Sequence, residues 1–183
     1  MATNDNPAPS YLQDEDGFTR LLDDWGDRLL RLCALYLKDM HLAEDAVQET
    51  LIKAWRNADK FRGDSSEITW ITRIAINVCK SYLRSPWKRR RAPAEELERL
   101  FTPSDDPQVD DTLPHAIMAL SRPYREVILL YYYQELKARE IADILGVDVS
   151  TVTARLSRAR KQLREALKGR YADEDTQSAE LSG

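Results

Sequence analysis

Five side chains between residues 70 and 84 have the types and spacing to bind an unpaired strand of nucleic acid. On a helix, at about 100° per residue, they follow one another along one face; they are Trp70, Arg73, Asn77, Lys80 and Arg84. Cations track phosphates, an amide pairs with a base edge, and an aromatic ring stacks on a base. The pattern also fits a core tryptophan beside a solvated basic face, so both interpretations stay open.

The other face of this predicted helix is apolar and suited to packing. Its members recur at helical spacing: Ile68, Ile71, Ala75, Val78, Cys79 and Tyr82. The preceding loop, FRGDSSEIT, holds Gly63 for chain reversal and Asp64, Ser65 and Ser66 as candidates for the helix cap. Such a loop, beside aromatic residues, can receive an unstacked base.

The net charge of -4 conceals blocks of alternating sign. Residues 60–91 hold 9 basic and 2 acidic side chains, and residues 113–170 hold 11 and 6. The other blocks are acidic: 6 basic and 12 acidic in 1–59, 1 and 7 in 92–112, and 0 and 4 in 171–183. Two basic blocks separated by acidic ones indicate two contacts with a polyanion.

A second motif lies in the later basic block, LKAREIADILGVDVSTVTARLSRARKQLREAL. We predict a helix with Ile141, Ala142 and Leu145 inward, a break at Gly146, and a second helix that starts after Asp148 and runs to about Leu167. This arrangement is a helix-turn-helix. The inner face of the second helix holds Val152, Leu156, Ala159, Leu163 and Leu167.

The outer face of that helix suits a DNA major groove, because small residues allow a close approach and long cations reach the backbone. Its members are Ser150, Thr153, Ala154, Ser157, Arg158 and Lys161. A supporting helix before it, LSRPYREVILLYYYQ, is predicted to turn Val127, Leu130 and Tyr131 inward. Three consecutive tyrosines cannot all face one way, so at least one should be exposed.

A third helix, LAEDAVQETLIKAWRNADKF, has an apolar residue on its charged face. The inner stripe is Ala43, Val47, Leu51, Ala54 and Ala58. The opposite face holds Asp45, Glu49, Ile52 and Arg56, with Gln48 and Lys53 at its edges. An apolar side chain rimmed by charges is how a helix docks on a partner, although single exposed isoleucines are also common.

The chain of 183 residues contains 6 glycines and no convincing strand alternation, which predicts an all-α fold of two small helical domains. We expect a mobile segment 1–16, a first domain 17–91, an acidic flexible linker 92–112, a second domain 113–170 and an acidic mobile tail 171–183. Cys33 and Cys79 are predicted to be core residues. Without a signal peptide or a spanning apolar run, the chain is expected in the cytoplasm.

Three strings resemble conserved regions two and four of bacterial sigma-70 family sigma factors. They are LAEDAVQETLIKAW, TWITRIAINVCKSYLR and the segment from LPHAIMAL to KQLREAL. With only these two regions and a short linker, the chain is similar to the extracytoplasmic-function (ECF) subgroup. The resemblance covers roughly residues 17–170.

The resemblance implies partners and roles for matching positions. The Asp-x-x-Gln-Glu helix would dock on the clamp helices of the largest subunit of core RNA polymerase, and the flap of the second largest subunit would be a further contact. The polymerase-binding residues would be Asp45, Gln48, Glu49, Ile52 and Arg56.

The resemblance also implies that the first domain captures a flipped base of the melted minus-ten element. The residues assigned to this contact are Phe61, Arg62, Gly63, Asp64, Ser65, Ser66, Trp70, Arg73, Asn77, Lys80 and Arg84. Trp70 stays open between a core wedge and a base contact.

The minus-thirty-five element would be read as duplex DNA by the recognition helix. The residues assigned to it are Ser150, Thr151, Thr153, Ala154, Arg155, Ser157, Arg158 and Lys161. The acidic linker would enter the polymerase cleft. An anti-sigma protein would hold the factor inactive. Such proteins are often anchored in the membrane, and an anchored one would hold the factor at the inner face of the membrane. No cofactor, metal or catalytic centre is implied, and a monomer is expected.

Two departures limit this transfer. Ile71 and Thr72 stand where family members often have Leu-Tyr, and the readout face is unusually small at Ala154 and Ser157. Two other classes remain alternatives. A stand-alone helix-turn-helix regulator predicts a dimer on a palindrome. A helical nuclease needs converging carboxylates for metal ions, whereas residues 60–91 offer only Asp64 and Glu67.

Overall fold

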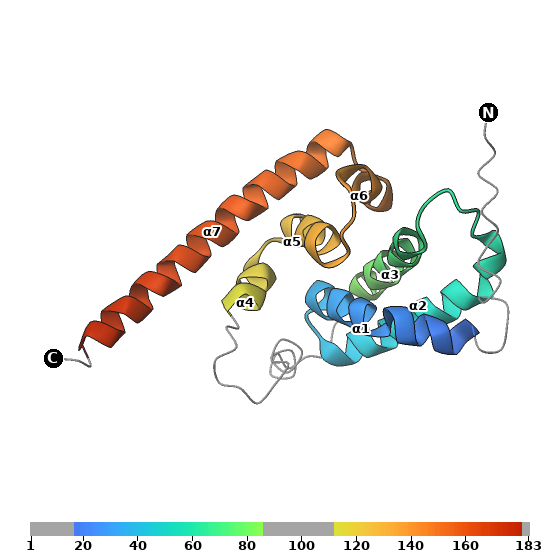
Figure 1. Ribbon diagram of the computed structural model, residues 1–183, viewed down its shortest axis with the longest axis horizontal. Helices are drawn as coiled ribbons and strands as arrows, with labels where there is room; N and C mark the ends of the chain where they lie inside the picture. The colour runs from blue at the N-terminus through green and yellow to red at the C-terminus, as the bar shows by residue number, and fades with distance from the viewer. Residues whose placement is uncertain (1–16, 86–111, 181–183) are drawn as a thin grey trace.

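Every regular element in the described part of the chain is a helix, as the sequence predicts (Figure 1). The computed structural model describes residues 17–85 and 112–180, with side chains of the last helix as far as Lys168. The segment 1–16, the linker up to residue 111 and the basic run 86–91 lie outside these ranges. We call α1 to α3 the first domain and α4 to α7 the second domain. Their expected limits at residues 91 and 113 stay predictions.

The first domain forms because each of its helices has one apolar face. Its elements are α1 (Gly17–Leu37), α2 (Met40–Arg56), a 3-10 turn η2 (Ala58–Lys60) and α3 (Glu67–Arg84). Both α1 and α3 pack on α2, and they also contact each other. The predicted inner stripe of α2 is buried, and so is the predicted packing face of α3 apart from half-buried Ile68.

Cys33 of α1 and Cys79 of α3 meet in this core, as predicted for two core residues. Their Sγ atoms lie 3.6 Å apart, and neither side chain is exposed. The hydrogen bond to Cys33, together with burial, raises the pKa of the Cys79 thiol well above its ordinary value. A protonated, buried thiol is a packing group rather than a nucleophile.

The second domain contains four α-helices and a π-helical turn. They are α4 (Thr112–Ala119), α5 (Arg122–Ile128), the π-helical turn η6 (Leu129–Tyr133), α6 (Ala138–Leu145) and α7 (Val149–Glu180). Val127 and Leu130 are buried as predicted, but Tyr131 is exposed, which corrects the expectation for this residue. The wider π turn shifts the side-chain phase at this point, so Tyr131 and Tyr132 face outward while Tyr133 is half-buried.

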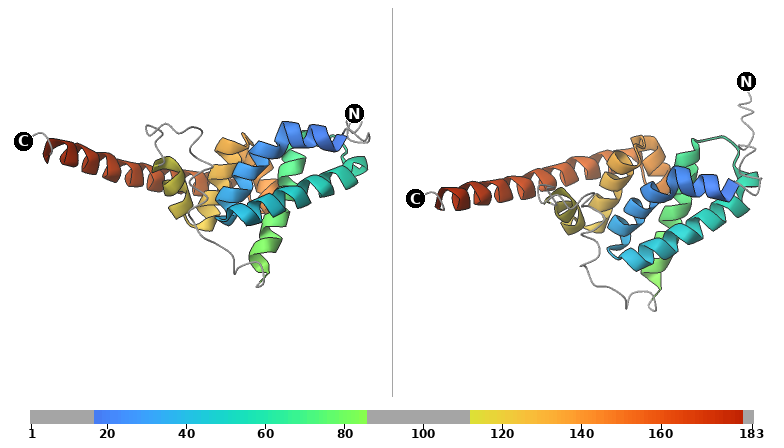
Figure 2. Two further views of the ribbon diagram at one scale, coloured as in Figure 1. Left: turned by 90° about the horizontal axis from the view of Figure 1, so that it is seen from below. Right: turned by 60° about the horizontal axis from the view of Figure 1, so that its bottom comes forward.

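The predicted helix-turn-helix is formed by α6 and α7. Gly146 ends α6 in the left-handed region at φ 69°, where a glycine has no steric penalty, and α7 starts directly after Asp148. Val152, Leu156 and Ala159 are buried beneath α7. The helix continues to Glu180 instead of ending near Leu167, and its later part extends away from the other helices (Figure 2). An interior glycine at position 169 costs a helix only about 1 kcal/mol, so it does not force an end there.

The two domains close against each other at the end of α1, which also contacts α4, α5 and η6. The Tyr36 hydroxyl donates to the Glu126 carboxylate and accepts a hydrogen bond from Arg122 Nη2 at 2.9 Å. Arg122 Nε also donates to Glu126 at 2.7 Å. Burial, followed by the Glu126 contact, raises the pKa of Tyr36, so its hydroxyl remains a donor.

Arg125 crosses the same junction and is 7% exposed. Its guanidinium donates to three backbone carbonyls, those of Met118 at 3.2 Å, Leu120 at 3.0 Å and Tyr36 at 3.5 Å. One buried cation thereby provides hydrogen-bond donors for backbone carbonyls at the end of α4 and at the end of α1.

A second set of contacts joins α3 and α1 of the first domain to α6 and the end of η6 in the second domain. Thr69 Oγ1 donates to Glu140 of α6 at 2.7 Å. Arg28 Nε donates to the carbonyl of Tyr133 at 3.0 Å, and the carbonyl of Arg28 accepts from Gln134 Nε2 at 3.4 Å. The start of α3 is therefore held directly against the helix-turn-helix.

We predict that Arg125→Ala lowers the free energy of unfolding by about 1–3 kcal/mol, because buried carbonyls lose their donor. Urea denaturation followed by circular dichroism measures the change. Arg139→Ala, an exposed arginine in the first turn of α6, is the matched control and should change stability by less than about 0.5 kcal/mol. Equal effects of the two substitutions would contradict a structural role for the buried cation.

Candidate nucleic-acid interface

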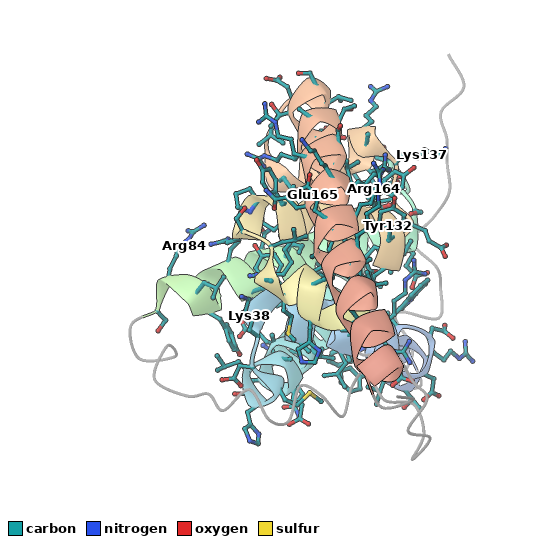
Figure 3. The ribbon with its side chains drawn as sticks, turned by 90° about the vertical axis from the view of Figure 1, so that its left-hand side faces the viewer. Lys38, Arg84, Tyr132, Lys137, Arg164 and Glu165 are labelled. Atoms are coloured by element: carbon teal, nitrogen blue, oxygen red, sulfur yellow. The ribbon has the colours of Figure 1, made fainter. Side chains whose placement is uncertain are left out.

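The stripe predicted on α3 is accessible along its whole length. Arg73, Asn77 and Arg84 are exposed, and Trp70 and Lys80 are half-buried. Figure 3 shows Arg84 pointing away from the body of the molecule at the end of α3. The opposite face of α3 packs in the core, so the helix separates its packing residues from its cations as the periodicity predicts.

A cleft of about 400 Å³ lies beside this stripe, between α3 and the end of α2. Its apolar wall comes from Trp70, Ile74 and Val78, and polar groups complete the lining: Lys53, Asn57, Lys60, Asn77 and Ser81. An aromatic ring, two amides and two lysines surrounding one cleft suit an unstacked base with its phosphate.

Asn57 is held in a fixed orientation within this cleft. Its Nδ2 donates to the carbonyl of Lys53 at 2.7 Å, and its Oδ1 accepts from Lys60 Nζ at 2.7 Å. Sequence reasoning missed Asn57 and Lys60, as well as Ile74 and Ser81. The signal available was the polar string NADK directly after α2, a polar turn that ends beside the α3 stripe.

The loop from Phe61 to Ser66 does not line this cleft, and the base pocket expected at that loop stays a prediction. Phe61 is buried and packs against Trp70 with ring centroids 5.3 Å apart, so it supports the tryptophan instead of facing a base. Ser66 caps α3 by accepting from the backbone N–H of Thr69. Arg62 and Asp64 are exposed, and Gly63 takes φ 73°, which lets the chain reverse before the cap.

Trp70 packs on the core side and also lines the cleft, so its position is compatible with both alternatives. One part of the ring packs on Phe61, and the side chain also contributes to the wall of the cleft. A ring held on one side by the core and open on the other is a preformed stacking surface. Thr72, by contrast, is fully buried, and its hydroxyl donates to Gln134 at 3.4 Å.

The outer face of α2 carries the residues expected to bind polymerase. Ile52 is 40% exposed, as predicted, and Trp55 beside it is 42% exposed. Asp45, Gln48 and Arg56 are exposed, while Glu49 is half-buried and accepts from Lys53 Nζ at 2.6 Å. Trp55 was not predicted, because its position lies outside the stripes that the periodicity identified.

The outer face of α7 is a polar surface on the second domain. The predicted residues Ser150, Thr153, Ala154, Ser157, Arg158 and Lys161 are exposed, and Thr151 and Arg155 are half-buried. Thr153 Oγ1 donates to the carbonyl of Val149 at 3.0 Å, so only its lone pairs remain available to DNA. The start of a helix adds partial positive charge toward phosphates.

An apolar groove of about 380 Å³ lies on another side of the second domain, between α4, η6 and α7. Its lining residues are Leu113, Ile117, Ile128, Tyr132, Tyr133, Arg160, Leu163, Arg164 and Leu167. Arg160 is held there by a 2.8 Å hydrogen bond from its Nε to the Tyr132 hydroxyl. Figure 3 shows Tyr132 and Arg164 near each other beside α7.

Among the described residues, no helix is both long and apolar enough to cross a membrane. The candidate functional features described above are all on the surface. They are a cationic stripe with a cleft, a helix-turn-helix, an apolar groove and a helix with exposed Ile52 and Trp55.

Two solved structures resemble this chain across both domains. CnrH in complex with the cytosolic domain of CnrY matches with a TM-score of 0.65 and 26% identity, over 88% of this chain and 95% of that chain. The sigma factor RpoE, in complex with the anti-sigma factor NepR from Bartonella quintana, matches with a TM-score of 0.69 and 28% identity, over 84% and 98%. Each match covers more of this chain than either domain alone, so both domains take part in it.

Curated relatives agree with this similarity. The chain is 32% identical to the ECF RNA polymerase sigma factor SigW of Bacillus subtilis, over 85% of this chain and 91% of that protein. It is 30% identical to the RNA polymerase sigma-H factor of Pseudomonas aeruginosa, over 84% and 88%.

Family models divide the chain as the fold does. Sigma-70 region 2 matches residues 21–90, and sigma-70 region 4 matches residues 110–163. Because both regions and full-length relatives match, the chain belongs to the sigma-70 family of RNA polymerase sigma factors and to its extracytoplasmic-function subgroup.

Proposed function

We propose that this sigma factor reads the minus-thirty-five element as duplex through α7 and captures the melted minus-ten strand on α3. The observation that carries the proposal is the cleft beside the α3 stripe, where Trp70, Asn57 and Asn77 lie between lysines. A duplex offers no free base to such a cleft, whereas a melted strand does. Sigma factors are non-enzymatic regulators of transcription initiation, so the free energy of binding the unpaired strand would drive the melting of the promoter.

The energy returned by strand capture is of the same order as the cost of melting. Unpairing a base costs a few kcal/mol, and stacking a captured base on an aromatic side chain returns about 1–3 kcal/mol. The stripe adds phosphate contacts at Arg73, Lys80 and Arg84. In this proposal α7 positions the complex on duplex DNA, and the first domain shifts the equilibrium toward the open state.

Core RNA polymerase would bind both domains. Exposed Ile52 and its charged neighbours on α2 form the surface for the clamp helices of the largest subunit. The apolar groove between α4, η6 and α7 is the corresponding surface on the second domain, and we assign the flap of the second largest subunit to it. The groove is formed by a different face of α7 from the residues assigned to DNA, so both partners can bind together.

The closed arrangement of the domains must open for this function. Thr69 of α3 and Glu140 of α6 are joined by a 2.7 Å hydrogen bond. The two promoter elements lie roughly 25 base pairs apart, which is about 85 Å along B-DNA at 3.4 Å per base pair. The closed form can therefore bind one element at a time, and polymerase would hold the domains apart.

The closed form is also the form that we expect an anti-sigma protein to bind. Both matched structures are complexes: CnrH is bound to the cytosolic domain of CnrY, and the sigma factor RpoE is bound to the anti-sigma factor NepR. We propose that this chain acts in the cytoplasm and has a comparable partner. A membrane anchor on that partner would place the complex at the inner face of the membrane.

Transcription in vitro tests the proposed function. The full chain with purified bacterial core RNA polymerase should start specifically on a subset of a mixed promoter pool. Initiation no more specific than that of core enzyme alone would contradict it.

We predict separable defects for the two DNA-binding surfaces. Lys80→Ala should slow open-complex formation on a promoter while leaving duplex binding at the minus-thirty-five element nearly unchanged. Arg158→Ala, on α7, should do the reverse. Permanganate footprinting measures melting and electrophoretic mobility shift measures duplex binding. Equal loss of both activities in both variants would contradict this division.

Asn77→Ala should relax the base preference at one position of the minus-ten element. An amide that pairs with a base edge contributes about 1–3 kcal/mol of discrimination, and alanine removes it. Initiation rates on a set of promoters with single substitutions in the minus-ten element identify the position. Ser81→Ala, at the same cleft, is the control, because the Ser81 hydroxyl already donates to the carbonyl of Val78 at 2.7 Å. Identical preferences for Asn77→Ala and the unaltered protein would exclude readout by Asn77.

Tyr36→Phe should favour the open arrangement, because it removes a hydroxyl that bridges the domains and leaves the ion pair of Arg122 and Glu126 in place. Hydrogen bonds to charged groups contribute about 1.5–3 kcal/mol, which is about tenfold or more in the closed-to-open ratio. Small-angle X-ray scattering should show a larger radius of gyration.

Tyr82→Phe is the matched control for Tyr36→Phe. The Tyr82 hydroxyl bonds to Glu49 within the first domain, so its loss should leave the radius of gyration unchanged. An increase of the same size in both variants would show that the bridge at Tyr36 does not govern closure.

A further inference from the structure

The apolar groove between α4, η6 and α7 carries two large apolar side chains that are open to solvent. Leu113 is 44% exposed and Tyr132 is 52% exposed. Ile117 and Ile128 line the same groove as buried residues, and Leu163 is half-buried on the α7 side. Exposed apolar side chains that gather in one groove indicate a surface that another segment covers.

Two arginines of α7 give this groove a positive charge. The Cζ atom of Arg160 lies 5.2 Å from the ring centroid of Tyr131 and 5.6 Å from that of Tyr132. Arg164 is exposed one turn later and lies near Tyr132 (Figure 3). None of the described residues that line the groove is a carboxylate. The groove therefore favours a segment that combines apolar side chains with acidic ones.

The chain itself holds a segment of this composition, EELERLF at 95–101, which lies outside the described residues. Its large apolar side chains have the spacing of one helix face, at about 100° per residue. They are Leu97, Leu100 and Phe101. By the same spacing, Glu96 and Glu98 flank that face, while Glu95 and Arg99 fall opposite it. The sequence pattern of the segment thus complements the groove in both apolar surface and charge.

Segment 95–101 is close enough along the chain to reach the groove. Leu113 lines the groove, and the residues between it and the segment span at most about 36 Å when fully extended. A contact within one chain acts at an effective concentration on the order of millimolar for a short tether. A contact that would be weak between separate molecules is therefore sufficient.

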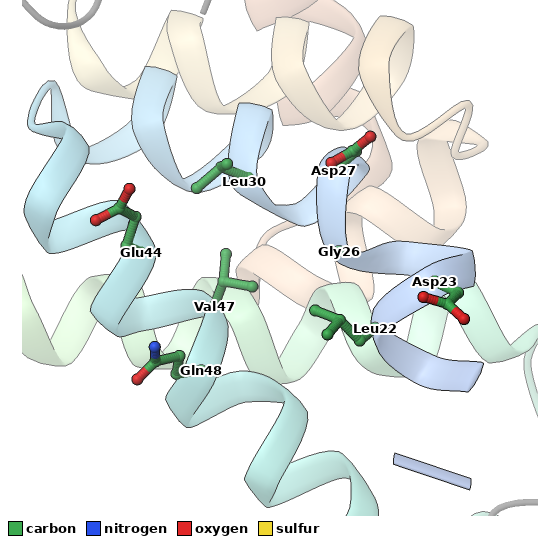
Figure 4. Close-up of a pocket in the computed structure, with 8 residues that line it drawn as sticks. All are labelled: Leu22, Asp23, Gly26, Asp27, Leu30, Glu44, Val47 and Gln48. Atoms are coloured by element: carbon green, nitrogen blue, oxygen red, sulfur yellow. The ribbon is translucent and has the colours of Figure 1, made fainter. Parts of the chain in front are cut away.

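The other two surface depressions suit this segment less well. The groove between α1 and α2 is lined by Asp23, Asp27 and Glu44, which would repel Glu96 and Glu98 (Figure 4). The cleft beside α3 contains lysines, but most of its lining residues are polar, so it offers less apolar surface to the segment.

We propose that segment 95–101 of this chain occupies the groove between α4, η6 and α7 while the protein is free of polymerase. Its apolar face covers the apolar lining, and a flanking carboxylate lies beside Arg160 and Arg164. The flap of polymerase, which we assign to the same groove, must then displace the segment, so the chain itself competes with polymerase for its second domain. The displacement rests on the proposed function, whereas the docking does not depend on it.

Methyl NMR of the full chain tests the docking without polymerase. Leu100→Asp should move the methyl resonances of Leu113 and Leu163, because a carboxylate in an apolar contact is unfavourable and the segment leaves the groove. Val109→Asp makes an equivalent change in the linker outside the segment and should leave these resonances in place. No movement with Leu100→Asp, or equal movement with both variants, would overturn the docking.

A second set of variants tests the charges. Glu96→Lys or Glu98→Lys, whichever flank faces α7, should move the same resonances, because it sets a cation against the two arginines. Glu95→Lys makes the same charge change on the opposite side of the segment and should leave them in place. The effect should shrink as salt is raised. Identical behaviour of the three variants would overturn the orientation of the segment.

Photocrosslinking from Phe101→p-benzoylphenylalanine in the full chain identifies the occupant of the groove. Irradiation should join this position to α4 or α7 of the same molecule, and purified bacterial core RNA polymerase should abolish the product. Cross-links between two molecules, or to the cleft beside α3, would overturn the proposal in favour of a second copy or another site. A cross-link that persists in a complex initiating at promoters would overturn the displacement.

Failure of this inference can be distinguished from failure of the proposed function. If transcription in vitro starts specifically while Leu100→Asp behaves like Val109→Asp, only the inference fails. If specific initiation is absent, the proposed function fails, and the NMR comparison still decides the docking because it uses no polymerase.

Discussion

The hydrogen bonds around Tyr36 and Arg125 determine how the rest of the molecule is arranged. They join the end of α1, the end of α4 and the start of α5 at one buried point. A buried arginine without partners would be strongly unfavourable, so the three backbone carbonyls must come together for the cation to be satisfied. The position of the second domain follows from this requirement, and so does the placement of α6 against α3.

Helix α3 uses three of its faces for three different contacts. Ile71 and Cys79 pack in the first domain, Thr69 and Thr72 bond to the second domain, and the cationic stripe faces solvent. A helix of this kind has few positions that are free to vary. Thr72 is one example, because its side chain is fully enclosed at the junction and bonds to Gln134.

The amphipathic pattern was sufficient to predict which faces are buried, because helix packing depends mainly on spacing. It placed Ile52 outside and Val152, Leu156 and Ala159 inside, and it located the break at Gly146. It failed at Tyr131, where the π turn changes the phase without any local signal in the residue types. The pattern gave no information on Phe61, because an aromatic residue in a polar loop has the same sequence context whether it contacts a base or packs on Trp70.

The cleft beside α3 was beyond the reach of periodicity for a different reason. Asn57 and Lys60 come from a turn that follows α2, and only the packing of α2 on α3 brings them opposite Asn77. The two grooves are likewise tertiary features, formed between helices that are each unremarkable alone. Sequence patterns describe one helix at a time, whereas these sites belong to pairs of helices.

Closure within a single chain has a quantitative consequence for every competing partner. The domains belong to one chain, so when they separate they stay near each other instead of diffusing apart. Their effective concentration is on the order of millimolar for a short tether, and closing competes at that concentration at all times. A partner that grips only one domain leaves the other free to return. A partner that engages both domains gains the avidity of two linked sites and removes the return step, which favours bivalent regulators over monovalent ones.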